Sequence, residues 1–196
     1  MNLNLCGYTL IILTLIVCLN MYKDSDALNL RCIISDIDGN RYCVRERQKL
    51  ELAADRLAQV SKKMTDLVIH CAKTYPDRKN MMRLKKGYNP KKIMETLPTS
   101  EYTAYSQNKG EKMAFCLNTE KNGDKLIDLN TLTFVAIHEL SHIATESIGH
   151  KQEFWDNFKF LLIEAVKIQI YEPYDYKKNP ARYCGTDIKD NPYFSN

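Results

Sequence analysis

The sequence lacks several features by which common classes of protein are identified. No two cysteines have the CxxC spacing, so a structural zinc cluster built from thiolates is not expected. The chain shows neither internal repeats nor low-complexity segments, so a repeat protein is not indicated. Its formal charge is only +4 over 196 residues, too small an excess to argue by itself for a nucleic-acid partner. Histidine is also scarce, with four in the whole chain.

The N-terminus lacks the basic residues that open a cleaved signal peptide. It also carries no charge from Leu5 to Tyr22, a stretch just long enough to cross a bilayer as a helix. We therefore predict an uncleaved transmembrane anchor in residues 1–27, membrane contact through residues 5–22 and a single-pass membrane location. There are two alternatives: a cleaved signal peptide with a weak cleavage site at residues 25–27, and a buried core helix. Residues 28–196 then form one domain.

Seven cysteines are present, and five of them lie outside the apolar N-terminal segment. Five is an odd number, so at least one of these thiols has no intrachain partner among them. Cys32 and Cys43 flank a predicted hairpin turn at Asp38-Gly39-Asn40. A disulfide between them and two reduced, buried thiols are both compatible with this pattern.

Hydrophobic periodicity predicts an α+β domain. Apolar residues recur every three or four positions from Leu50 to Cys71, as on one face of a long helix. That helix should end near Tyr75, because Pro76 follows. Basic residues between Arg78 and Lys92 are interpreted as a solvated face rather than a nucleic-acid site. The expected elements are a hairpin over 30–44, the long helix, a loop with a short helix over 78–97, a hairpin over 102–117, helices starting near 131 and at 150, and a surface tail from 171.

Three of the four histidines lie between residues 138 and 150. Two of them belong to the stretch His138-Glu139-Leu140-Ser141-His142, an HExxH motif. On a helix, positions i and i+4 share a face, so His138 and His142 can present two imidazoles to one Zn²⁺ ion. The motif therefore predicts a zinc hydrolase.

A third zinc ligand must come from elsewhere, because a catalytic zinc site holds three protein ligands and an open position. Gly149 suits a left-handed turn, and the apolar helix that His150 opens can hold this imidazole over the other two. We choose His150 as the third ligand. The alternatives are Glu146, Glu153 and Glu164.

Glu139 is placed as the catalytic residue and not as a ligand. It lies about 100° around the helix from His138, where its carboxylate can reach a zinc-bound water. Zinc lowers the pKa of that water, and Glu139 takes its proton as hydroxide attacks a carbonyl, then passes it to the leaving amine. Residues 113–117 are the expected edge strand for an extended peptide. Candidate stabilisers of the oxyanion are Tyr171, Tyr174, Tyr176 and Tyr183.

The HELSH stretch followed by GHKQEFW resembles the WLM and SprT-like zinc metallopeptidases. In the WLM group a third histidine is followed after three residues by Phe-Trp, as His150 is by Phe154-Trp155. The resemblance implies zinc ligands at His138, His142 and His150, with Glu139 as acid and base. The His142-to-His150 spacing is longer than in the usual WLM motif. The strings TAYSQNKGEKMAFCLN and Tyr183-Cys184-Gly185 are similar to uncharacterised metallopeptidase-like proteins of large DNA viruses.

These observations predict a zinc-dependent peptidase that acts on proteins or peptides from a membrane. The expected fold is a small zincin-like domain with a long N-terminal helix, short hairpins, an HExxH helix and a C-terminal helix, preceded by a transmembrane helix. One alternative is a membrane-tethered binding protein with a structural or vestigial zinc site. The other is a DNA-associated protease of the SprT type.

Overall fold

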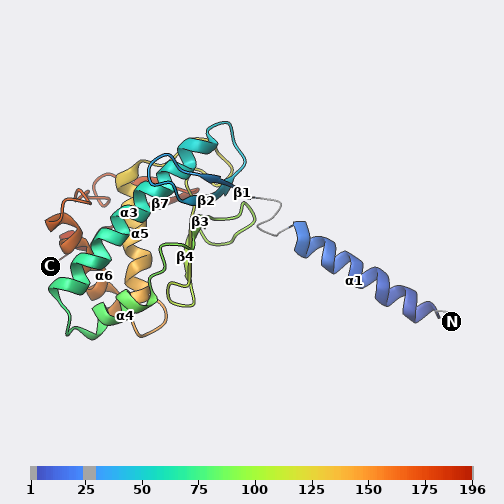
Figure 1. Cartoon of the computed structure of the whole chain (residues 1–196), viewed down its shortest axis with the longest axis horizontal. Helices are drawn as coiled ribbons and strands as arrows, with labels where there is room; N and C mark the ends of the chain where they lie inside the picture. The colour runs from blue at the N-terminus through green and yellow to red at the C-terminus, as the bar shows by residue number, and fades with distance from the viewer. Residues whose placement is uncertain (1–3, 24–29, 196) are drawn as a thin grey trace.

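The computed structural model describes residues 4–23 and 30–195, and its main part is an α+β fold built on a mixed five-stranded sheet (Figure 1). The strands are β1 (Leu30–Ile34), β2 (Arg41–Arg45), β3 (Ile93–Glu95), β4 (Ala104–Gln107) and β5 (Lys112–Phe115), in the order β1-β2-β3-β5-β4. Strand β3 runs parallel to both of its neighbours, while β1 with β2 and β4 with β5 form antiparallel hairpins. The α+β class expected from the sequence is confirmed.

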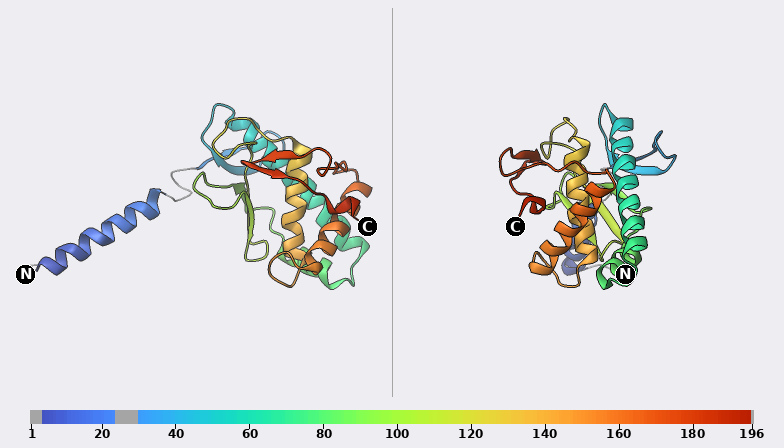
Figure 2. Two further views of the ribbon diagram at one scale, coloured as in Figure 1. Left: turned by 180° about the vertical axis from the view of Figure 1, so that it is seen from behind. Right: turned by 90° about the vertical axis from the view of Figure 1, so that its left-hand side faces the viewer.

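The helices α3 (Leu50–Thr74), α4 (Lys79–Gly87), α5 (Leu129–Ala144) and α6 (Gln152–Lys167) pack with this sheet. Helix α1 (Leu5–Lys23) precedes them in the chain and lies apart from them (Figure 1). Helix α5 packs against α3 and β4 on one side and against α6 on the other (Figure 2). The chain ends in a small hairpin of β6 (Ala181–Tyr183) and β7 (Thr186–Ile188) and a short 3₁₀ helix, Pro192–Phe194.

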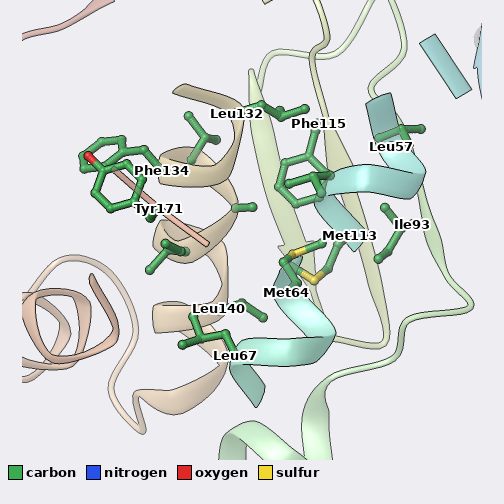
Figure 3. Close-up of a cluster of buried hydrophobic side chains, with 14 of the residues drawn as sticks. Leu57, Met64, Leu67, Ile93, Met113, Phe115, Leu132, Phe134, Leu140 and Tyr171 are labelled. Carbon is green, nitrogen blue, oxygen red and sulfur yellow. The ribbon is translucent and has the colours of Figure 1, made fainter. Parts of the chain in front are cut away.

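The apolar stripe on α3 is the centre of the core, as its spacing predicts. The stripe residues are all buried: Leu50, Ala53, Leu57, Val60, Met64, Leu67 and Cys71. The helix ends at Thr74, just before Tyr75, as expected. Figure 3 shows Leu57, Met64 and Leu67 of α3 among side chains from the sheet and from α5. Burial of these side chains fixes α5 against the sheet through the hydrophobic effect.

Helix α5, which carries the HExxH motif, begins at a side-chain cap. The carboxylate of Asp128 accepts a hydrogen bond from the backbone N–H of Thr131 at 2.8 Å, so Asp128 is the N-cap. Twelve of the sixteen residues of α5 are buried. Because the helix is buried along most of its length, its backbone is held in place and so are the positions of its partly exposed side chains, His138 and His142 among them.

Two expectations about strands are corrected. The predicted hairpin over residues 102–117 is present, but β5 lies between β3 and β4, so residues 113–117 are not an edge. The free edge on this side is β4. Strand β3 was not expected at all, because three residues next to a basic stretch give no periodic signal.

The predicted transmembrane anchor and the single-pass membrane location are also corrected. Residues 5–23 do form a helix, α1, but no helix in residues 4–23 and 30–195 is long and apolar enough to cross a membrane. The prediction relied on the absence of charge, which also admits polar side chains such as Thr14 and Asn20. The predicted boundary between residues 27 and 28 and the weak cleavage site at 25–27 lie outside the described residues.

The cysteines divide into paired and free groups. Cys32 and Cys43, opposite each other in β1 and β2, form the disulfide that the hairpin suggested. A second disulfide joins Cys116, directly after β5, to Cys184 between β6 and β7. Cys71 is free and buried, which fits the odd number of cysteines.

The C-terminal segment does not simply cover the surface as expected. Three of its tyrosines are buried in the core cluster: Tyr171, Tyr176 and Tyr183. Because the second disulfide also ties this segment to the end of β5, the segment is part of the fold.

Truncating the core face of α3 should destabilise the domain. Leu57→Ala removes a fully buried side chain, and we expect the free energy of unfolding to fall by about 2–5 kcal/mol through lost burial and a cavity. Leu52→Ala on the same helix, at a side chain 46% exposed, should change it by less than about 0.5 kcal/mol. Urea unfolding of the two variants measures both values, and equal losses would contradict the assigned core face.

Cys71 should resist alkylation in the native protein. Burial, with a smaller contribution from Glu164, raises the pKa of its thiol to about 12, and the thiolate is the reactive form. Iodoacetamide treatment followed by site-resolved mass spectrometry should label Cys71 only after unfolding in denaturant. The exposed Cys18 is the control and should be labelled in the native chain. Equal native labelling of both thiols would contradict the burial of Cys71.

Candidate metal centre

The two motif histidines lie one turn apart on α5 and face the same side. Their rings are 5.0 Å apart between centroids, and both are half-buried. This arrangement follows from the i and i+4 spacing on a helix. The buried remainder of α5 faces the core, so the two imidazoles point away from it.

The third histidine reaches the same point from the segment between α5 and α6. His150 Nε2 lies 3.1 Å from His138 Nε2 and 3.1 Å from His142 Nε2. The metal-ligating atoms of the three residues all lie within 4.8 Å of one another. A tetrahedral ion with bonds of about 2.0–2.1 Å separates its nitrogen ligands by about 3.3–3.4 Å. The two distances from His150 are close to this separation, so the three imidazoles are arranged as potential ligands of one ion.

The segment from Thr145 to His150 is held by side chains of its neighbours. The Glu153 carboxylate accepts hydrogen bonds from the N–H groups of Glu146 and Ser147, at 2.9 and 3.2 Å. The Asn157 amide donates to Thr145 Oγ1 at 2.9 Å. Further contacts come from Arg83, which donates to the carbonyl of Ala144 and pairs with the carboxylate of Glu146, and from Lys109, which donates to three carbonyls.

An aromatic floor supports the three imidazoles. The ring centroid of Phe154, a fully buried residue of α6, lies 4.8, 4.4 and 4.6 Å from those of His138, His142 and His150. The indole N–H of Trp155 donates to the carbonyl of His150 at 3.1 Å. The Phe154 contacts restrict the orientation of the three imidazole rings, and the Trp155 hydrogen bond holds the backbone of His150.

The two motif histidines, His138 and His142, are neutral at pH 7. Burial, with help from the neighbouring imidazoles, lowers the pKa of His138 to about 3. Burial, followed by His150 and Lys109, lowers the pKa of His142 to about 4. Neutral imidazole is the form that binds a metal.

Glu139 lies beside the cluster in a dry environment. It is 5% exposed, and burial raises the pKa of its carboxyl to about 8. Burial, followed by the negative charge of the nearby Glu139 carboxylate, raises the pKa of the Tyr183 phenol. Its hydroxyl donates to the carbonyl of Thr103 at 3.1 Å, next to the start of β4.

The structure separates the other candidate ligands from the cluster. Glu164 is buried elsewhere, where it bonds His70 at 2.8 Å and Tyr75 at 3.0 Å. Burial opposes ionisation there, but hydrogen bonds from Lys167, His70 and Tyr75 lower the pKa of Glu164 overall. Glu146 pairs with Arg83, and Glu153 holds the segment before His150. Among the four candidates, only His150 is brought to the pair.

An open groove of about 870 Å³ exposes the cluster to solvent. It is lined by the three histidines, Glu139 and the edge strand β4, together with side chains on either side of them. None of the four predicted oxyanion tyrosines lines it; the groove tyrosines are Tyr102 and Tyr105. Sequence reasoning missed these two because it placed the edge at residues 113–117. Another hollow, of about 900 Å³ between α3 and α4, contains none of the histidines.

Comparison with known proteins finds relatives in large DNA viruses. The chain is 31% identical over 166 residues to an uncharacterised protein of Acanthamoeba polyphaga mimivirus, covering 80% of this chain and 81% of that one. The chain belongs to the same viral protein family. Uncharacterised proteins of invertebrate iridescent virus 6 (32% over 109 residues) and virus 3 (31% over 97 residues) are also similar, with 55% and 50% of this chain covered and 60% and 55% of theirs.

The predicted likeness to viral proteins is thus confirmed. No protein-family model matches the chain, and no solved structure matches it significantly. Membership of the WLM or SprT-like metallopeptidases is therefore not supported by these comparisons, and the case for peptidase chemistry depends on the site itself.

Proposed function

We propose that this protein is a zinc-dependent peptidase that cleaves protein or peptide substrates in the groove beside β4. The observation that carries the proposal is that His150 Nε2 lies 3.1 Å from the Nε2 atoms of both His138 and His142. The buried carboxyl of Glu139 lies next to this cluster. His138, His142 and His150 would hold the ion. A zinc ion bound in this way polarises a carbonyl and makes water more acidic.

Glu139 supplies the proton transfers that peptide hydrolysis needs. Its carboxylate would accept a proton from the attacking water and deliver it to the leaving amine nitrogen, as general base and then general acid. The position of Glu139 supports this role, because it lines the groove beside the three histidines. Burial raises the pKa of its carboxyl in the metal-free chain, and the positive charge of a bound Zn²⁺ would favour the ionised, proton-accepting form.

The surroundings of the cluster favour a catalytic over a structural zinc site. Structural sites are closed by four protein ligands, whereas catalytic sites keep three and leave one position open. Among the described residues, the cluster gathers three potential ligands and faces a groove. A site of this kind admits a substrate to the fourth position.

The groove also offers a backbone surface for an extended peptide. Strand β4 pairs with β5 on one side, and within the described residues no strand pairs with its other edge. A free edge beside the histidines can take a peptide by strand addition, with main-chain hydrogen bonds for affinity. A peptide bound in this way would lie along Ala104–Gln107 instead of along residues 113–117.

Loss of His150 should abolish tight zinc binding. His150→Ala removes one of three imidazoles, so zinc affinity should fall by more than the roughly 10–100-fold that loss of a supporting partner costs. His70→Ala is the matched control, because His70 bonds Glu164 outside the cluster. Competition with a chromophoric chelator measures both. Unchanged affinity in His150→Ala would remove it from the ligand set.

Loss of the Glu139 carboxylate should separate binding from catalysis. Glu139→Gln should keep stoichiometric zinc while cleavage of a fluorogenic peptide library or of unfolded protein falls at least about 100-fold. Glu51→Gln, at an exposed position of α3, should leave cleavage unchanged. A wild-type chain that binds zinc, unfolds when zinc is chelated and cuts no substrate would instead indicate a structural zinc site.

A further inference from the structure

Lys109 joins the tip of the β4–β5 hairpin to the end of α5. Its ammonium donates hydrogen bonds to the backbone carbonyls of His142, Thr145 and Ser147, at 3.2, 2.8 and 3.2 Å. A lysine ammonium has three N–H donors, so these carbonyls can use all of them. The first carbonyl belongs to a motif residue, and the third lies three residues before His150.

The charge of Lys109 is suited to this position. The last carbonyls of a helix have no partner within the helix and carry the negative end of its dipole. The ammonium therefore stabilises the last turn of α5 as well as the segment that leaves it. Charge-assisted hydrogen bonds of this kind are stronger than neutral ones.

Two glycines allow the hairpin tip to approach so closely. A Cβ added at Gly87, the last residue of α4, would lie 2.4 Å from the carbonyl oxygen of Lys109 and 2.6 Å from Ile143 Cγ2. A Cβ at Gly110 would lie 2.4 Å from the carbonyl oxygen of Gly87. The tip is thus packed backbone to backbone on α4 and against α5.

The backbone of Lys109 has a conformation that few residues with a side chain adopt. Its φ is +56°, in the left-handed region that favours glycine, and the neighbouring Asn108 has φ +48°. A side chain in this region costs free energy and persists where the surroundings require it. The ammonium contacts give a reason for a lysine where glycine would be relaxed.

We propose that Lys109 is a positioning residue that holds the segment 145–150, and through it His150, in place for metal binding. The metal-binding part of this inference depends on the proposed zinc site. Lys109 lies in the turn that follows β4, so in this proposal the turn next to the groove's edge strand holds the third histidine. Loss of an outer partner of this kind weakens metal binding by about 10–100-fold, so we expect at least about tenfold for Lys109.

The test compares Lys109→Gly and Lys109→Met with Asn108→Gly. Both lysine variants lose the ammonium, but only the glycine relieves the left-handed backbone. Asn108→Gly relieves similar strain in the same turn, where the Asn108 amide bonds the carboxylate of Glu111. Zinc affinity by chelator competition and amide hydrogen exchange of residues 145–150 in the metal-free chain are measured for all three.

Both lysine variants should bind zinc at least about tenfold more weakly and exchange faster at 145–150, although Lys109→Gly should be the more stable of the two. Asn108→Gly should match the wild type in both measurements. Unchanged exchange in the lysine variants, or an equal effect in Asn108→Gly, would overturn the role of Lys109. A wild-type chain without zinc affinity whose lysine variants still exchange faster would overturn the zinc site and leave the positioning role standing.

Discussion

The reversal of the chain between α5 and α6 is the constraint on which the site depends. If α5 continued, His150 would lie about 12 Å further along the axis than His142, beyond the reach of a shared ion. Instead the helix ends at Ala144, and the chain turns back within a few residues. The turn is held by groups from three directions: α4, the β4–β5 hairpin and α6. Because each contributes a charged side chain, the site depends on both the helices and the sheet.

Burial of α5 supplies the rigidity that such a site needs. The helix contributes to the hydrophobic core through most of its length, and Phe154 closes the core directly beneath the imidazoles. Side chains packed at the density of a protein interior have few alternative rotamers. The packing beneath the three histidines is therefore rigid, while the groove that they line is open to solvent.

The comparisons and the site carry different kinds of information. Relatives in mimivirus and in iridescent viruses place the chain in a viral family, and their similarity extends over half of it or more. The motif that suggested the WLM group covers only a few residues around HELSH and Phe154-Trp155. A short motif constrains local chemistry and says little about the remaining fold, so it does not by itself show membership of that group, and no family model matches the chain.

Local pattern determined much of the structure. The stripe from Leu50 to Cys71 and the hairpin turn at Gly39 depend on neighbours in sequence, so the sequence alone predicted α3, the β1–β2 hairpin and a helix that carries the HExxH motif. The pairing of His138 with His142 follows from the helical repeat. Tertiary structure alone decided that β4 is the edge strand, that Cys116 pairs with Cys184, that Glu164 is engaged by His70 and that Lys109 reaches the end of α5. Those relations join residues far apart in the chain, so they follow from how the elements pack and no local pattern in the sequence could show them.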